Sequence, residues 1–143
     1  MNIHEYMREC QDKRYQWGEF DCCTFAAGAI EVATGVDVMA PYRTYIDEMS
    51  CAITMNENFG STNIRDAFLK LAATVNGRVI DVSEARDGDV VCIQWPLATY
   101  NKGKVDQRQG MGVFYRYSAW ACLCPQGITR IPLTHRIIDV WRF

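Results

Sequence analysis

The sequence predicts an α+β fold, in which N-terminal helices pack on a C-terminal, mainly antiparallel β-sheet. Apolar residues recur at helical spacing through the first half of the 143-residue chain. After Gly77 the pattern changes to short runs rich in β-branched and aromatic residues, each bounded by Gly, Pro, Asp or Asn. These runs lie too close together for intervening helices, which favours antiparallel pairing. At this length, residues 1–143 are expected to form one domain.

Two helices are expected near the N-terminus. The first covers residues 2–13, where Asn2 can cap the helix. The second covers residues 22–33, with Asp21 well placed as its N-cap. Its apolar residues fall on one side, and Gly35 ends it in the usual way.

Two more helices are expected before the strands begin. A short helix is predicted over residues 42–50, and the stretch MNENFGS, residues 55–61, is predicted to be a loop. Thr62 or Asn63 then caps an amphipathic helix whose apolar residues follow the i, i+3, i+4, i+7, i+8 spacing. Gly77 closes this helix and starts the strand-rich half.

Five segments are expected to form strands. They are RVIDV (78–82), DVVCIQW (89–95), GVFYRYSAWACLC (112–124), ITRIPL (128–133) and IIDVWRF (137–143). The polar stretch over residues 99–110 is expected to be a hairpin-like excursion. Trp95, Trp120 and Trp141 lie in strand patterns, so we expect them to be core or interface anchors.

The composition excludes several classes of protein. Hydrophobic residues make up 49% and charged residues 22%, which is ordinary globular composition. The net charge is −2 and no basic run occurs, so nucleic acid is not an expected partner. No apolar stretch approaches the roughly 20 residues that a membrane span needs. The first residues, MNIHEYMREC, do not form a signal-peptide pattern.

The chain contains seven cysteines, an odd number that does not suggest a disulfide framework. Most lie in apolar surroundings, where a free cysteine behaves as a small core residue. A metal site built from Cys22, Cys122 and Cys124 is the alternative, although it lacks an obvious fourth ligand and the usual paired C-x(2–4)-C spacing. We therefore expect reduced thiols and no cofactor.

Cys22 is the main candidate for chemistry. The first turn of a helix offers free backbone N–H groups and a partial positive charge, and both stabilise a thiolate. Cys23 follows directly, and successive helical side chains diverge by about 100°. We therefore expect one of the two thiols to face a cleft and the other to be buried.

The order of motifs resembles the NlpC-like branch of the papain-fold cysteine peptidases. Trp17-Gly18 and Asp21-Cys22 match the turn and the nucleophile position, and Gly88-Asp89 matches the turn before the first core strand. The resemblance runs from Tyr15 onward and implies an NlpC-like papain-type fold. Those enzymes cleave peptidoglycan stem peptides, using a histidine at the start of a strand as the base.

The histidine position departs from that pattern. Aligning the Gly112 strand with the peptidase strand places Gly110 where the catalytic histidine stands, and glycine cannot accept a proton. No His, Asp, Glu or Asn occurs between Trp120 and Cys124, where the third catalytic position falls. The chain has two histidines, His4 and His135, and the alternative to a lost base is a rebuilt Cys22–His135 dyad.

The C-terminal half is similar to a small phage-associated family that is distantly related to these peptidases. The shared features are a glycine strand without the histidine, the segment Gly127-Ile128 through Pro132-Leu133, and the terminal Trp141-Arg142-Phe143. The resemblance implies a structural component of the tail tip or tail-assembly apparatus of a long-tailed bacteriophage. It would be made in the bacterial host cytoplasm, reside in the virion and contact hub, distal tail or tail-fibre proteins. The alternative is an active cysteine endopeptidase or amidase that cleaves peptidoglycan during genome entry.

Overall fold

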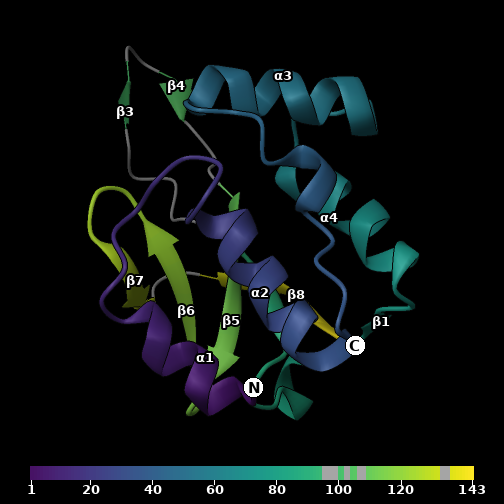
Figure 1. Ribbon diagram of the computed structural model, residues 1–143, viewed down its shortest axis with the longest axis vertical. Coiled ribbons are helices and arrows are strands. Elements are labelled where there is room, and N and C mark those ends of the chain that lie inside the picture. Colours follow the sequence, from purple (N-terminus) through teal and green to yellow (C-terminus); the bar gives the residue numbers. More distant parts are fainter. Residues whose placement is uncertain (95–99, 102–103, 106–108, 133–135) are drawn as a thin grey trace.

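The chain folds into helices followed by an antiparallel sheet, as the α+β prediction requires. The computed structural model describes residues 1–94, 100–101, 104–105, 109–132 and 136–143. The helices are α1 (Ile3–Cys10), α2 (Cys22–Thr34), α3 (Glu48–Phe59) and α4 (Ile64–Thr74), with short 3-10 turns η1 (Ala40–Tyr42) and η2 (Val82–Glu84). In Figure 1, α2 lies across the sheet and α3 stands at one end of the molecule. None of the helices described is long and apolar enough to cross a membrane.

Side-chain caps fix the helix starts that the sequence predicted. Asn2 forms a capping box at α1, Asp21 accepts the backbone N–H of Thr24 at α2, and Asn63 caps α4. Gly35 ends α2 in the left-handed conformation, with φ 78°. Each of these signals is local, which is why the sequence alone indicates them.

The prediction for residues 42–61 is wrong. A helix was expected over 42–50 and a loop over 55–61, but α3 spans Glu48–Phe59. The helix begins late because Asp47 and Ser50 form its capping box. It continues through the polar stretch because Met55 and Phe59, one turn apart, are both buried.

The main sheet has six strands in the order β1-β8-β2-β5-β6-β7, and all its pairings are antiparallel. The strands are β1 (Arg78–Val79), β2 (Val90–Gln94), β5 (Gln109–Tyr115), β6 (Ser118–Leu123), β7 (Gly127–Arg130) and β8 (Arg136–Arg142). A separate antiparallel pair, β3 (Tyr100–Asn101) with β4 (Lys104–Val105), lies within the excursion expected over residues 99–110, but Gln109 and Gly110 belong to β5 of the main sheet. The expected single strand over 112–124 is two strands, because Arg116 and Tyr117 both take positive φ and form a tight hairpin turn.

The core lies on both faces of the sheet. The larger cluster fills the space between the helices and the sheet and includes Phe25, Phe68 and Trp141. A smaller cluster on the opposite face includes Val91, Ile93 and Val140. Trp141 is fully buried, as predicted, and Trp120 is half-buried with its indole N–H donating to the Tyr115 carbonyl at 3.1 Å. Trp95 lies outside the described residues.

Two of the short motifs in the sequence have clear structural roles. At Gly112, a Cβ atom would lie 2.3 Å from the Trp120 carbonyl oxygen, so β5 and β6 approach too closely there for any side chain. Asp89, from the Gly-Asp turn, forms a two-point ion pair with Arg142, from the terminal Trp-Arg. The pair joins the start of β2 to the end of β8.

Candidate functional site

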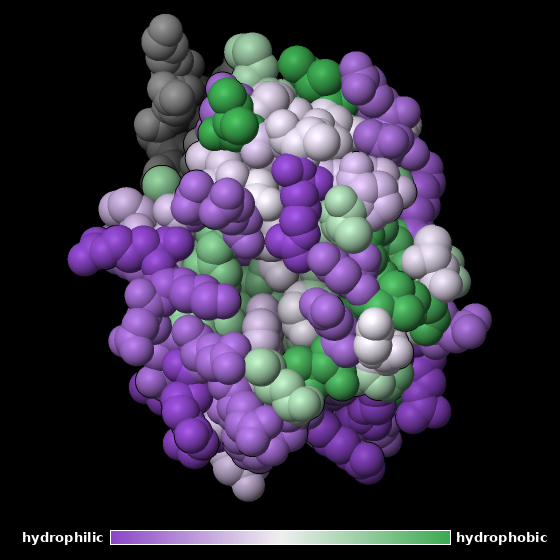
Figure 2. All heavy atoms as spheres, in the orientation of Figure 1, coloured by the Kyte–Doolittle hydropathy of each residue, from purple (hydrophilic) through white to green (hydrophobic). Residues whose placement is uncertain are grey.

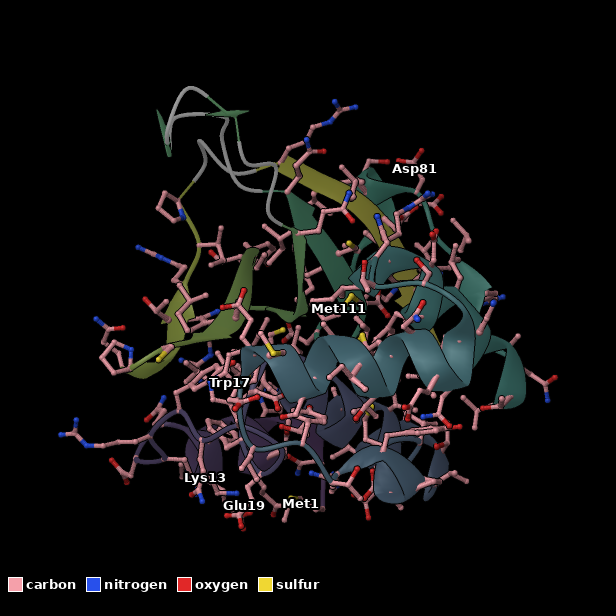
Figure 3. All side chains as sticks on the ribbon, turned by 90° about the horizontal axis from the view of Figure 1, so that it is seen from above. Met1, Lys13, Trp17, Glu19, Asp81 and Met111 are labelled. Carbon is pink, nitrogen blue, oxygen red and sulfur yellow. The ribbon has the colours of Figure 1, made fainter. Side chains whose placement is uncertain are left out.

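The candidate site is an open cleft of about 900 Å³ between the helices and the central strands. It lies where the turn before α2, the start of α2, one side of α3, and the ends of β5 and β6 meet. Its lining residues are Tyr15, Trp17, Cys22, Glu48, Ala52, Thr62, Ile64, Gln109, Gly110, Cys122, Leu123 and Cys124. Figure 3, which looks down on α3, labels Trp17 and Met111 in the part of the view where several sulfur atoms are drawn.

Cys22 is the first residue of α2 and its side chain lines the cleft, whereas Cys23 is buried with 2% of its surface exposed. The expectation that the two thiols face different surroundings is therefore confirmed. Their sulfur atoms are 3.9 Å apart, within reach of a weak S–H···S hydrogen bond.

The surroundings of Cys22 favour its thiolate. A hydrogen bond with the Cys23 thiol is the largest effect, and it lowers the pKa of Cys22 below that of an ordinary thiol. Burial and the charge of Asp21 oppose this shift, while the backbone N–H groups of Met111 and Cys23 add to it. The same hydrogen bond, together with burial, raises the pKa of Cys23 well above its usual value. Either thiol can donate in this pair, and the two pKa directions favour the arrangement in which Cys23 donates to the Cys22 sulfur.

Asp21 is buried at the start of α2, where it holds the entrance of the helix in place. Its Oδ1 accepts the N–H of Thr24 at 2.9 Å, and its Oδ2 accepts the N–H of Gly18 at 2.9 Å. The hydroxyl of Tyr45 donates to the same Oδ2 at 2.6 Å. All three bonds are buried, so Asp21 fixes the turn before Cys22 as well as the helix cap.

Tyr45→Phe is expected to lower the free energy of unfolding by about 1.5–3 kcal/mol, the usual contribution of a hydrogen bond to a charged group. Burial and the nearby Asp21 charge raise the pKa of Tyr45, so its hydroxyl stays protonated and able to donate. Urea denaturation would measure the loss. Tyr117→Phe is the control, because Tyr117 is 96% exposed and its substitution should change little. Equal stability of both variants would contradict the role given to Tyr45.

Gly110, at the position that the alignment assigns to the catalytic base, has no side chain. Gly110 lines the same cleft as Cys22, and the backbone N–H of the next residue, Met111, contributes to the lowered pKa of Cys22. Among the described residues that line the cleft there is no histidine. His4 lies elsewhere, because its Nδ1 is 2.9 Å from the hydroxyl of Tyr115. Tyr115 is five residues along β5 from Gly110, a distance of roughly 17 Å in an antiparallel strand.

The whole chain, and with it the cleft, falls within a known protein family. The model of a domain of unknown function, DUF6950, matches residues 1–143. The chain belongs to the DUF6950 family. No curated protein and no solved structure matches the chain. The family match runs from α1 to the end of β8, so the cleft lies within one DUF6950 domain.

The remaining predicted site residues of this DUF6950 chain are only partly brought together. Cys122 and Cys124 line the same cleft as Cys22, at the end of β6 and just after it. Within the part of the chain that the structure describes, no three His, Cys, Asp or Glu side chains are arranged to hold a metal ion. Burial and the nearby Cys22 raise the pKa of the Cys122 thiol. His135 lies outside the described residues.

Sequence reasoning missed several residues that shape the cleft of the DUF6950 domain. Glu48 and Ala52 come from α3, which the sequence placed incorrectly, so no signal could assign them. Tyr45 carries no motif, and its bond to Asp21 joins residues 24 positions apart. Gln109 could have been suspected, because it directly precedes the Gly110 position that the alignment singled out.

Proposed function

We propose that the chain is a structural component of the tail tip or tail-assembly apparatus of a long-tailed bacteriophage, built on an NlpC-like papain-type fold without peptidase activity. In this proposal it resides in the virion, after synthesis in the host cytoplasm. Its partners are other tail proteins, such as hub, distal tail or tail-fibre components. The peptidase scaffold serves as a rigid block for binding.

Gly110 is the observation that carries the proposal. A cysteine hydrolase needs a base beside its thiol, both to take the proton and to return it to the leaving amine. Here Cys22 lines the cleft at the N-terminus of α2, but the strand position that the alignment assigns to the base is Gly110, which has no side chain. The end of β6 and the residue after it, where the third polar group would lie, contribute Cys122, Leu123 and Cys124 to the cleft instead.

The surface of α3 supports a role in assembly. Ile46, Met49 and Ile53, at and just before this helix, expose 79%, 75% and 51% of their surface. Figure 2 shows apolar side chains gathered over α3 at the top of the view. Ala52 of the same helix lines the cleft, so the apolar stripe continues to its rim. Exposed apolar surface of this kind is typical of contacts with other proteins.

Virions assembled with Cys22→Ala are expected to remain infectious, with plating efficiency within a few-fold of the parent, because the thiol performs no hydrolysis during infection. The measurement is plaque formation by the phage or prophage that encodes the chain, with electron microscopy of the tails. Tyr117→Phe provides a matched surface control. A complete loss of infectivity with normally assembled tails would count heavily against the structural role.

The second candidate function is a working cysteine endopeptidase or amidase acting on peptidoglycan. Its support is the lowered pKa of Cys22 in an open cleft at a helix N-terminus. It requires that purified protein release fragments from muropeptides and that Cys22→Ala abolish the release. Chromatography of muropeptides incubated with each protein tests this directly. Muropeptides that stay intact with the parent protein would exclude the hydrolase and leave the structural role standing.

A further inference from the structure

The turn between β5 and β6 has a sequence that does not suit its geometry. Arg116 and Tyr117 are its two central residues, and their φ angles are 49° and 63°. A two-residue hairpin turn with positive φ at both positions favours Asn-Gly, because larger side chains lose free energy in the left-handed region. Residues that are held in this conformation at such a cost cluster at functional sites. The Arg-Tyr pair is therefore a candidate for a role in binding.

Both side chains of this pair face solvent. Tyr117 exposes 96% of its surface, more than any other large hydrophobic residue in the described part of the chain. The Arg116 guanidinium lies 5.3 Å from the centre of the Tyr115 ring, and among the described residues no group accepts a hydrogen bond from it. In Figure 1 the β5 arrow points away from α3, so the turn lies at the opposite end of the molecule, near α1.

Neighbouring elements hold the turn in place. Oδ1 of Asp87 accepts the backbone N–H of Arg116 at 2.8 Å, which ties the turn to the segment before β2. The hydroxyl of Tyr115 is 2.9 Å from Nδ1 of His4 in α1, and the Tyr115 carbonyl accepts the Trp120 indole N–H at 3.1 Å. A turn that is fixed in this way loses little conformational freedom when it binds, so its exposed side chains are already positioned for a partner.

The chemistry of the turn favours a protein partner with an acidic surface. Tyrosine and arginine are enriched among the residues that carry most of the binding free energy at protein interfaces. A guanidinium group with free N–H donors matches the geometry of a carboxylate. Nucleic acid is a poor match, because its binding depends on several phosphate contacts and the net charge of the chain is −2.

We propose that the β5–β6 turn docks on another protein, by inserting the Tyr117 ring into an apolar pocket whose rim supplies a carboxylate to Arg116. The ring is the anchor, so Tyr117→Phe should bind as the parent does. This surface is separate from the Cys22 cleft, because β5 begins at the cleft with Gln109 and ends at the turn. In a phage tail the partner would be another tail protein, but the docking itself does not depend on the tail role.

Photo-crosslinking from the turn is the first test. Tyr117→p-azidophenylalanine keeps the aromatic ring and adds a photoreactive azide. Irradiation of the bacterium that produces the chain should crosslink this residue to one protein, at an acidic segment that mass spectrometry identifies. Leu69→p-azidophenylalanine, at a 37% exposed position of α4, should not give this product.

The charge of Arg116 is tested in the same experiment. Arg116→Glu should lower the crosslink yield about tenfold or more, the effect expected for a residue at the centre of an interface. Replacing the acidic residue of the crosslinked segment by lysine should restore the yield. Arg78→Glu is the matched control, because it makes the same change of charge at an exposed position of β1, at the edge of the sheet. A yield that is equally insensitive to both changes would refute the assigned ion pair.

Replacing the turn by Asn-Gly separates binding from folding. The double variant Arg116→Asn with Tyr117→Gly should unfold at higher urea concentration than the parent, because its residues suit the turn. The same variant should no longer bind the crosslinked partner in a pull-down with purified proteins, whereas parent and Tyr117→Phe should. A defect in a more stable variant cannot result from misfolding. Binding that equals that of the parent would overturn the proposal, and an unfolding midpoint below that of the parent would contradict the cost assigned to the Arg-Tyr pair.

The crosslinked protein also distinguishes this proposal from the tail role. A specific product at an acidic segment of a protein outside the tail would support docking and count against the tail role. No product specific to position 117, in a phage whose virions contain the chain, would overturn docking and leave the tail role standing.

Discussion

Arg142→Leu is expected to lower the free energy of unfolding by about 3 kcal/mol, because it leaves a buried carboxylate without its cation. Asp89 is 4% exposed, and its two oxygens accept Nε and Nη2 of Arg142 at 2.9 and 2.7 Å. Arg142 also donates to the Glu84 carbonyl at 3.0 Å. The loss falls at the lower end of the range for a broken buried pair, since part of the arginine side chain reaches solvent.

Urea denaturation followed by circular dichroism would measure this loss, with Arg130→Leu as the matched control. Arg130 ends β7 with an exposed side chain, so its replacement should change stability by less than about 0.5 kcal/mol. Combining Arg142→Leu with Asp89→Val should recover part of the loss, because no lone buried charge remains. Recovery should be incomplete, because Asp89 also accepts the backbone N–H of Arg86. A loss no larger than that of Arg130→Leu would show that the ion pair contributes little.

The parts of the fold that the sequence predicted correctly depend on short-range interactions. Asp21 and Gly35 bound α2 through contacts with residues three or four positions away, so their roles can be inferred from a few letters. The antiparallel sheet follows from the close spacing of apolar segments. The position of α3 could not be inferred in this way. Its polar residues resemble a loop, and Met55 and Phe59 keep it helical through burial in the folded core.

The features of the site also separate into those that short-range sequence signals predict and those that depend on the folded structure. The cleft-facing position of Cys22 follows from its place at a helix start, and Gly110 was singled out by its place in the motif order. The Cys23 hydrogen bond depends on side-chain orientation, which adjacency alone does not give. The pairing of Asp89 with Arg142 joins residues 53 positions apart. Local analysis assigned Asp89 to a turn, and only the sheet order brings the two charges together.

Cys23→Ala is expected to raise the pKa of Cys22, because it removes the thiol that donates to the Cys22 sulfur. The thiolate is the reactive form, so the rate of alkylation by iodoacetamide rises as the pH passes through the pKa. In the parent protein this rise should occur at lower pH than for a model thiol. In Cys23→Ala it should move to higher pH, and the neutral-pH rate should fall about tenfold for each unit of change in pKa. Peptide mapping after alkylation at a series of pH values would follow Cys22 alone.

Cys23→Ser is the matched control, because its hydroxyl is also a donor and should keep the pKa of Cys22 low. If the pH profile of Cys22 alkylation does not shift in Cys23→Ala, the helix N-terminus and the Met111 N–H stabilise the thiolate without the Cys23 thiol. The expected shift would separate two properties that usually occur together in a cysteine hydrolase. A histidine activates the thiol and also protonates the leaving amine, whereas the high-pKa thiol of Cys23 replaces only its effect on the sulfur. Rapid alkylation of Cys22 is therefore not sufficient to show hydrolysis, and the decisive measurement for enzyme activity is muropeptide cleavage.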